Sequence, residues 1–386
     1  MNPALLPPVS RLPEVGTTIF TVMSGLAQAH GAINLGQGFP DFDCDPALID
    51  AVDRAMRAGH NQYPPMAGVP ALREALSDKI ERLYGHRYHP DHEITITAGA
   101  TQGLLTALLA LVHPGDEVVV LEPCYDAYQP GIALAGGRCV RVPLAEGGQR
   151  PDIERLRAAL TPRTRVVIVN TPHNPTGAVW RRDEWEALAG LLAPTQTLLL
   201  SDEVYEHMVY DGGTHLSASS IPGLAERAVV VSSFGKTYHV TGWKVGHVAA
   251  PAALTAEFRK VHQFNVFTVN TPMQHGLAEM LKAPEHYLGL SAFYQAKRDH
   301  LRAGLRGTAF ELLPCEGSYF QCVRHPQALE MGDQAFCEWL VKEIGVAAIP
   351  LSAFYRSAGE AGIVRLCFAK REGTLDAALQ RLQGLR

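Results

Sequence analysis

The sequence predicts an α/β fold with a large domain built on a mainly parallel sheet and a smaller α/β domain. Between about residue 45 and residue 280, helical patterns alternate with short β-branched runs, which is typical of a parallel sheet with crossover helices. The chain has 386 residues, too many for one simple core. Beyond about residue 285, a long helical pattern leads into shorter segments. We therefore predict an N-terminal arm (1–44) that joins the small domain, a large domain (45–284) and a small domain (285–386).

The individual elements follow from local patterns along the chain. Residues 1–30 are punctuated by proline and only weakly periodic, so we expect an arm that lies on another surface. Apolar residues at helical spacing predict helices at 46–58, 69–83, 101–112, 182–192 and 287–305. Short β-branched or apolar runs predict strands at 117–121, 166–169, 198–201, 229–232 and 245–249. Because parallel sheets bind ligands at the carboxyl ends of their strands, functional side chains are expected directly after each strand.

Composition and charge exclude several classes of partner. The net charge is −5, the sequence pI is near 6.3 and no run of lysine or arginine occurs, so we expect neither a nucleic-acid nor a membrane partner. No apolar segment approaches the roughly twenty residues that span a bilayer, and no signal-peptide pattern opens the chain, so a cytoplasmic protein is expected. The seven cysteines are scattered and never form C-x-x-C, which predicts reduced thiols and no metal site.

Residues 232–246, S-S-F-G-K-T-Y-H-V-T-G-W-K-V-G, follow a predicted buried strand and centre on Lys236. We expect them to form a loop rich in small and hydroxyl residues. A partly desolvated lysine beside a second cation loses basicity and can form an imine with an aldehyde near neutral pH. Lys244 supplies such a cation, and Ser233 supplies a hydroxyl. One alternative is an ordinary solvated lysine. Another is the end of a P-loop, but that motif needs a glycine where this chain has Val230.

Three predicted strand or helix ends carry further polar groups. S-D-E-V-Y places Asp202 and Tyr205 after the strand at 198–201. The end of this strand therefore carries a carboxylate and a phenol, although a helix N-cap is the alternative role for Asp202. N-T-P-H-N-P-T-G holds Asn174 in a loop that two prolines make rigid. T-A-G-A-T-Q-G opens a helix at Ala100 and Thr101, which suits a phosphate but also describes a plain helix start.

Three more positions complete the set of candidates. L-G-Q-G-F-P-D-F brings Gly38 into a segment that allows close backbone approach or is a plain turn. Arg365 stands inside the apolar run I-V-R-L-C-F, where it needs an anion, either a substrate carboxylate or a structural ion-pair partner. Tyr125, in E-P-C-Y-D, is an aromatic residue after a strand, a place where core packing is also common.

Taken together, these motifs resemble the pyridoxal-phosphate-dependent class I/II (fold-type I) aminotransferases. The resemblance runs from about residue 12 to residue 385 in matching order and spacing, and it is closest to the methionine aminotransferase and kynurenine aminotransferase branch. It implies a mainly parallel seven-stranded sheet in the large domain and a homodimer with a shared active site. Two positions depart from the wider pattern: Lys244 stands where arginine is common, and His173 stands where asparagine or lysine is frequent. We interpret His173 as a tolerated variant without a catalytic role.

The resemblance assigns roles residue by residue. Lys236 would be the catalytic residue, binding the pyridoxal phosphate covalently and moving the proton. The remaining cofactor contacts would be Asp202 at the pyridine nitrogen, Asn174 and Tyr205 at the phenolic oxygen, Tyr125 stacked on the ring, Ala100, Thr101, Ser233 and Lys244 at the phosphate, and Tyr63 at the phosphate of the neighbouring subunit. The substrate contacts would be Gly38, Asn174 and Arg365 at the carboxylate, with Ile19, Phe20 and the partner's Phe267 at the side-chain end.

The implied function is transamination between an amino acid and a 2-oxo acid. No second arginine is placed at the side-chain end, so methionine or aromatic amino acids, kynurenine included, are expected as donors rather than aspartate. Two alternatives remain. One is a cysteine-S-conjugate carbon–sulfur β-lyase on the same scaffold. The other is a non-catalytic, pyridoxal-phosphate-binding regulatory domain, which normally accompanies a helix-turn-helix module, whereas this sequence starts directly with the arm.

Overall fold

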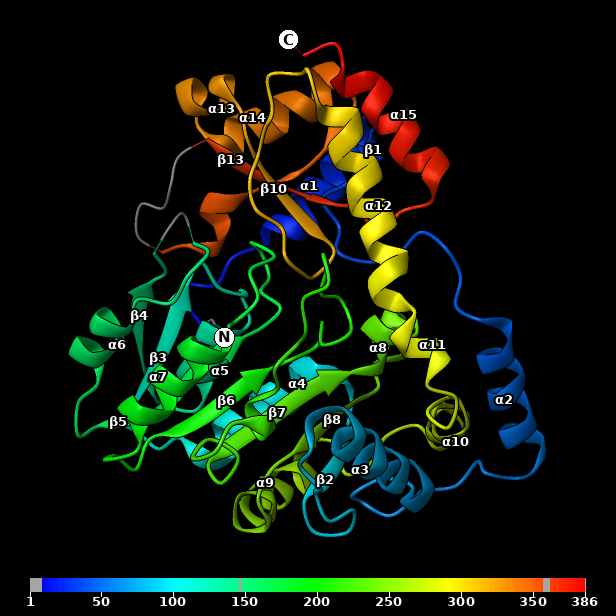
Figure 1. The fold of residues 1–386 in the computed structure, drawn as a ribbon, viewed down its shortest axis with the longest axis vertical. Coiled ribbons are helices and arrows are strands. Elements are labelled where there is room, and N and C mark those ends of the chain that lie inside the picture. The colour runs from blue at the N-terminus through cyan, green and yellow to red at the C-terminus, as the bar shows by residue number, and fades with distance from the viewer. Residues whose placement is uncertain (1–8, 146–147, 357–361, 386) are drawn as a thin grey trace, which may run out of the picture.

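The computed structural model describes residues 9–145, 148–356 and 362–385, so the first eight residues of the predicted arm lie outside the described chain. Its centre is a seven-stranded sheet that crosses the lower half of Figure 1. Only β8 runs antiparallel to its neighbours, which confirms the mainly parallel sheet. In sheet order the strands are β2 (Ile94–Thr97), β8 (Gly246–Ala249), β7 (Ala228–Ser233), β6 (Leu198–Asp202), β5 (Thr164–Asn170), β3 (Glu117–Glu122) and β4 (Arg138–Pro143).

Helices cover both faces of this sheet, which explains why its central strands are apolar without alternation. In β3, Val118 and Val120 pack with α4 (Gly99–Leu111) on one face, while Val119 and Leu121 pack with α7 (Arg182–Leu192) on the other. One face carries α4 (Gly99–Leu111), α5 (Tyr128–Leu134) and α9 (Ala252–Asn265). The other carries α6 (Ile153–Ala159), α7 (Arg182–Leu192) and η1 (Ala218–Ser220). Next to β2, α3 (Pro70–Tyr84) and α2 (Pro46–Arg57) pack on α10 (Thr271–Met280).

A second, antiparallel sheet lies above the first in Figure 1. Its order is β12 (Ile349–Pro350), β13 (Ile363–Cys367), β10 (Phe320–Arg324) and β9 (Glu311–Leu312). The helices around it are α11 (Glu285–Leu288), α12 (Leu290–Leu305), α13 (Pro326–Met331), α14 (Asp333–Trp339), the π-helical turn η3 (Leu340–Ile344), η4 (Leu351–Phe354) and α15 (Glu372–Leu382).

The N-terminal arm packs against this second sheet region. Its helix α1 (Ile19–Ala29) contacts β11 (Val346–Ala347) and α14, and its strand β1 (Ile33–Asn34) pairs in parallel with β11. The arm therefore lies beside segments more than three hundred residues away in sequence, as the blue and orange elements of Figure 1 show. The domain boundaries at 44/45 and 284/285 stay a prediction.

Some local patterns differ from the expectation. No strand was predicted at β2, which is only four residues long, or at β4, an edge strand whose two arginines interrupt its apolar pattern. The segment after β7 was expected to be a loop, but it begins with one helical turn, α8 (Phe234–Thr237), followed by η2 (Thr241–Trp243). The Oγ of Ser233 accepts from the amide of Gly235 at 3.2 Å and so caps this turn, which an isolated S-S-F-G string does not reveal.

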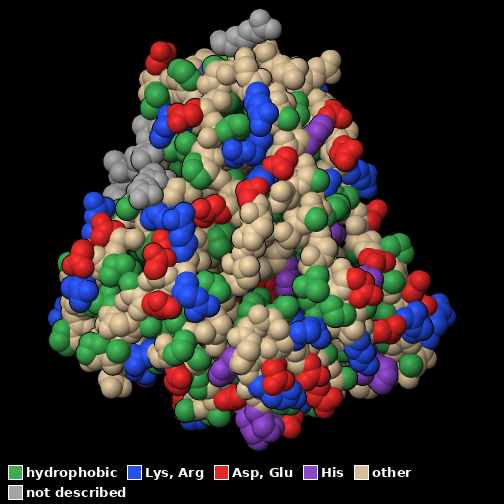
Figure 2. Space-filling model, viewed as in Figure 1, with side chains coloured by type: hydrophobic (Ala, Val, Ile, Leu, Met, Phe, Trp, Pro, Cys, Tyr) green, Lys and Arg blue, Asp and Glu red, His purple; other side chains and the backbone are tan. Residues whose placement is uncertain are grey.

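The surface carries charges of both signs. Figure 2 shows Lys and Arg side chains interspersed with Asp and Glu side chains over the face in view. None of the helices in the described part of the chain has the length and hydropathy that a bilayer crossing requires. Within the same residues, no group of three or more His, Cys, Asp or Glu side chains is arranged to hold a metal ion. All seven cysteines are free thiols in the structure.

Candidate active site

A cavity of about 330 Å³ opens where β5, β6 and β7 end and α4 begins. Its size lies at the lower end of the range for small-molecule sites, about 300–1,000 Å³. The second sheet closes it from above with Phe320 and Arg365. The predicted site residues that line it are Phe20, Gly38, Ala100, Thr101, Tyr125, Asn174, Asp202, Tyr205, Ser233, Lys236, Lys244 and Arg365. The cavity therefore gathers residues that the sequence places on eight separate segments.

Lys236 projects into the cavity from the helical turn after β7. Its Nζ lies 2.8 Å from the Tyr319 hydroxyl and 3.4 Å from the carbonyl oxygen of Gly38. Burial lowers the pKa of this amine to about 8, and the nearby Lys244 acts in the same direction. A lower pKa means that a larger share of the amine is neutral, and thus nucleophilic, near neutral pH.

Asp202, the last residue of β6, is only 4% exposed. Its Oδ2 accepts a hydrogen bond from the Tyr128 hydroxyl at 2.7 Å, and its backbone carbonyl accepts from the Asn170 side chain at 2.9 Å. Burial raises the pKa of this carboxyl to about 6, although the Tyr128 hydroxyl and the nearby Lys236 act in the opposite direction. β6 runs into a turn, so Asp202 is not the N-cap of a helix. A buried carboxyl of this kind favours a cationic partner inside the cavity.

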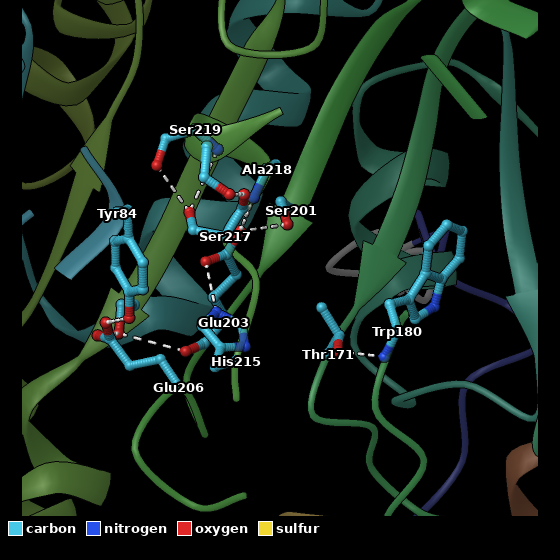
Figure 3. A network of polar contacts seen from close by, with 12 residues as sticks. Tyr84, Thr171, Trp180, Ser201, Glu203, Glu206, His215, Ser217, Ala218 and Ser219 are labelled. Carbon is cyan, nitrogen blue, oxygen red and sulfur yellow. Dashed lines mark hydrogen bonds and ion pairs between the residues drawn. The ribbon is translucent and has the colours of Figure 1, made fainter. Parts of the chain in front are cut away.

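The side chains at Asp202 and in the turn after it belong to two separate groups. Asp202 and Tyr205 line the cavity, whereas Glu203 and Glu206 belong to a buried polar network (Figure 3). In that network, the Glu206 carboxylate pairs with the amine of Lys79 at 2.8 Å. The hydroxyls of Tyr84 and Ser232 donate to the same carboxylate at 2.5 and 2.7 Å.

Glu203 anchors the same turn to the loop before β7. Its carboxylate accepts from the Ser201 hydroxyl at 2.8 Å and from the Ala218 amide at 2.9 Å, and it lies 2.9 Å from the His215 ring (Figure 3). Ser232, which contacts Glu206, directly precedes the cavity residue Ser233. The network therefore holds the ends of β6 and β7 at fixed positions behind the cavity.

We expect Glu206→Ala to lower the free energy of unfolding by about 3–5 kcal/mol, because it leaves Lys79 buried without its partner. The two side chains are only 3% and 5% exposed. Urea denaturation measures the change. The matched control is Glu279→Ala, which removes an ion pair whose side chains are both 58% exposed. That change should cost at most about 1 kcal/mol. Equal losses for the two variants would contradict a structural role for the network.

The pH dependence of this contribution has a definite sign. Burial alone would raise the pKa of Glu206, but Lys79 holds it well below its usual range. A carboxyl with a depressed pKa stabilises the fold above its unfolded pKa, about 4.3, and loses that contribution as pH falls. The stability difference between the wild-type protein and Glu206→Ala should therefore shrink in acid.

One end of the cavity is suited to an anion. The first turn of α4 presents the amides of Ala100 and Thr101, whose donors have no partner inside the helix. A Cβ on Gly99, which has a φ of +78°, would come within 3.3 Å of the Lys244 Nζ, so glycine lets this amine approach the helix start. Ser233 adds a hydroxyl beside them.

The opposite end holds Arg365, on β13, which is 1% exposed. Its guanidinium donates to the Asn174 side chain at 2.6 Å and to the Gly36 carbonyl at 3.1 Å, while its buried Nε has no hydrogen-bond partner among the described residues. Three aromatic rings surround the guanidinium: its Cζ lies 3.8 Å from the ring centre of Phe320, 5.0 Å from that of Phe354 and 5.3 Å from that of Phe20. No carboxylate of the described chain forms an ion pair with it. This buried cation therefore lines the cavity without a counter-ion from the described chain, which leaves its guanidinium available to an anionic ligand.

Three predicted site residues do not line the cavity of a single chain. Tyr63 is 80% exposed and Phe267 is 43% exposed, and their rings pack edge to face with centres 5.3 Å apart. Ile19 is half-buried at the start of α1 and packs against the hydrophobic core. The roles predicted for these three residues remain predictions.

Several residues of the site were missed in the sequence. Tyr128 and Asn170 bond Asp202, and Tyr319 bonds Lys236. Asn170 had a usable signal, since it is the first polar residue after the apolar core of β5. Tyr319 gave no such signal, because it comes from a segment that forms the second sheet. His173 is buried outside the cavity, bonds the Thr176 hydroxyl at 2.8 Å and has a pKa that burial lowers to about 4.

The cavity fits pyridoxal phosphate group by group. The start of α4 with Lys244 suits the phosphate, and the buried carboxyl of Asp202 suits a protonated pyridine nitrogen. The amine of Lys236 is available to an aldehyde between these two ends. Arg365 lines the cavity without a carboxylate partner from the described chain, so its guanidinium is left for a carboxylate that the cofactor itself does not carry.

Comparison with known proteins shows to which family the chain belongs. Residues 30–382 match the family profile "Aminotransferase class I and II". The chain is 52% identical, over 100% of its length and 99% of the relative's, to a methionine aminotransferase of Escherichia coli. A crystal structure of an Escherichia coli methionine aminotransferase superposes with a TM-score of 0.96 at 52% identity, covering 99% of this chain and 100% of that one.

Two further relatives are named for other substrates. The structure of N-succinyldiaminopimelate aminotransferase from Mycobacterium tuberculosis superposes with a TM-score of 0.94 at 42% identity, covering 98% of this chain and 100% of that one. Human kynurenine–oxoglutarate transaminase 1 is 35% identical over 93% of each chain. The chain therefore belongs to the class I and II aminotransferases, enzymes that use pyridoxal phosphate to transfer an amino group between an amino acid and a 2-oxo acid.

Proposed function

We propose that this aminotransferase takes methionine and aromatic amino acids, kynurenine included, as amino donors. The observation that carries the proposal is the environment of Arg365. This guanidinium is available to the substrate α-carboxylate, and the rings of Phe20 and Phe320 line the cavity beside it. The other cations that line the cavity within the described chain, Lys236 and Lys244, belong to the amine and phosphate positions. An acidic side chain would therefore find no cation of its own.

Apolar contact then distinguishes the donors. Each buried methylene contributes about 0.8 kcal/mol, so an unbranched thioether or an aromatic side chain gains from the phenylalanine-lined end. A second carboxylate there would lose hydration without gaining a partner. The name of the Escherichia coli relative agrees with this preference, and that of the human relative supports the aromatic part of it.

We propose roles for the cavity residues from the family resemblance, and their place in the cavity supports these roles. When bound, pyridoxal phosphate supplies an electron sink for the electron pair left at the substrate α-carbon. Lys236 provides the amine that holds the cofactor and moves the proton, and Asp202 holds the ring nitrogen in its cationic form. The phenolic oxygen would be bonded by Asn174 and Tyr205, the ring would stack on Tyr125, and the phosphate would bind Ala100, Thr101, Ser233 and Lys244. Gly38, Asn174 and Arg365 would bind the α-carboxylate, with Ile19 and Phe20 at the substrate side chain.

We further propose that the protein is a homodimer whose two subunits share the active site. We also propose that it works in the cytoplasm. Tyr63 and Phe267 are exposed together, and Phe264 nearby in sequence is 87% exposed, so a second copy has an apolar surface to cover. In such a dimer, Tyr63 would reach the partner's phosphate site and Phe267 the partner's substrate pocket. The seven free thiols support a reducing compartment. Division of each subunit at 44/45 and 284/285 is part of the same proposal.

A donor comparison tests the substrate proposal. We expect kcat/KM for methionine, phenylalanine and kynurenine, each with one common 2-oxo acid, to exceed that for aspartate by at least about a hundredfold, because an unpaired buried carboxylate costs several kcal/mol. Pyruvate release from a cysteine S-conjugate without added 2-oxo acid measures the carbon–sulfur lyase alternative in parallel. If aspartate or N-succinyldiaminopimelate is the most efficient donor, the proposal is wrong.

A further inference from the structure

Tyr319 lies directly behind the amine of Lys236. It precedes β10, belongs to the second sheet region and is fully buried. Its hydroxyl lies 2.8 Å from the Lys236 Nζ and donates to the carbonyl of Gly38. The contact therefore joins three segments that are far apart in sequence: the N-terminal arm, the turn after β7 and the start of β10.

The direction of these hydrogen bonds follows from the groups involved. A carbonyl oxygen only accepts, so the Tyr319 hydroxyl uses its one proton on Gly38. Its lone pairs then remain for other donors, and those in reach include the Lys236 amine and the hydroxyl of Tyr205. Because the hydroxyl accepts from the amine, the contact favours the protonated form of Lys236.

The ring of Tyr319 cannot move away from this position without repacking its neighbours. It packs against the rings of Phe320, Tyr205 and Tyr294 at centre distances of 4.8, 5.1 and 5.9 Å. Gly38 must also be glycine for its carbonyl to come this close, since a Cβ there would lie 2.8 Å from the Phe320 ring. Tyr294 offers a natural comparison, because it is equally buried and its hydroxyl has no hydrogen-bond partner in the part of the chain that the structure describes.

We propose that Tyr319 is a positioning residue for the proton transfers of Lys236, a role that rests on the function proposed for that lysine. When the amine takes the proton from the substrate α-carbon, an N–H bond forms as the C–H bond breaks, and the Tyr319 hydroxyl holds the resulting ammonium. When a proton returns to the product, that N–H bond breaks again. The sequence needs no oxidant, reductant or further reactant.

The test compares Tyr319→Phe with the matched variant Tyr294→Phe, which removes a hydroxyl from the same aromatic cluster without touching Lys236. In cofactor-free protein, the pH dependence of Lys236 acetylation, followed by peptide mass spectrometry, reports the pKa of its amine. We expect Tyr319→Phe to lower that pKa by about one unit through loss of an acceptor, and Tyr294→Phe to leave it unchanged. The other ionisable groups that act on Lys236 are Lys244, Asp202, Cys367 and Arg365, and all four are retained in both variants.

The holoenzyme supplies a second, independent readout. We expect Tyr319→Phe to lower kcat about tenfold or more, to change KM less than threefold, and to enlarge the primary isotope effect with α-deuterated methionine, because proton transfer becomes slower. Tyr294→Phe should behave as wild type. If the two variants show the same amine pKa and the same isotope effect, the proposal is overturned.

A measurement on the wild-type protein covers the case in which Tyr319→Phe does not fold. Crystals exposed to an amino donor alone contain Lys236 released from the cofactor. The proposal requires its Nζ within hydrogen-bond distance of the Tyr319 hydroxyl there, and a separation above about 4 Å would overturn it. If Lys236 proves dispensable for turnover, the proposed function fails, whereas the acetylation experiment still reports whether Tyr319 sets the pKa of that amine.

Discussion

Replacement of Lys236 by alanine should reduce turnover by about four powers of ten or more. Among the described residues that line the cavity, no other group can take over, because the Lys244 amine lies against the start of α4 and the guanidinium of Arg365 does not lose its proton near neutral pH. General acid–base catalysis alone contributes about 10²–10⁴-fold, and a residue that also binds the cofactor covalently contributes more. Lys236 forms no ion pair within the described chain, so the variant should keep its fold.

Two measurements separate this chemical loss from damage to the protein. The visible absorption of a covalently held cofactor should be present in the wild-type protein and lost in Lys236→Ala, with the thermal unfolding temperature nearly unchanged. Lys260→Ala is the matched control, since that side chain is 69% exposed on α9 and should keep full activity. Lys236→Ala enzyme that transaminates at the wild-type rate would show that the central assignment is wrong.

The strands that could be predicted from the sequence are those whose apolar side chains directly reflect their burial. β5, β6 and β7 lie in the middle of the sheet with helices on both faces, so each reads as an unbroken apolar run. β4 lies at the sheet edge, where half-exposed positions accept Arg138 and Arg141, and its pattern resembles a loop. Whether a strand lies in the middle or at the edge of the sheet is defined only by the tertiary structure. This position therefore decided which strands could be predicted.

The same distinction applies to the site. Residues that act on a ligand occupy fixed places after strands or at a helix start, and those places are visible in the sequence. The residues that keep those side chains in position cannot be recognised in the sequence, because their contacts join segments that are far apart in it. Tyr128 bonds Asp202 across 74 positions and Tyr319 bonds Lys236 across 83. Only the folded chain brings such pairs of residues together.

Asp202→Asn should bind the cofactor and lose about 10²–10³-fold or more in kcat, the size of effect seen when one well-placed electrostatic group is removed. Tyr128 donates to Oδ2 of Asp202, and the amide oxygen of asparagine can accept the same bond, so the local structure should persist. What the variant lacks is the negative charge that would hold a pyridine nitrogen in its protonated form. The expected signature is thus a low kcat with a cofactor dissociation constant changed much less.

The pKa of Asp202 explains why the charge matters. In the cofactor-free protein burial raises that pKa to about 6, so the fold itself disfavours the carboxylate, and this contribution to stability is lost as pH rises from about 4 through 6. A cation bound beside it reverses the preference and lowers the pKa, and the same coupling stabilises the cation. Glu203→Gln is the matched control, because Glu203 is one residue away and equally buried but faces the network behind the cavity. It should keep kcat within about tenfold, as the group lies away from the reacting atoms. Near-normal turnover in Asp202→Asn, or equal losses in both variants, would reduce Asp202 to a structural residue of the turn.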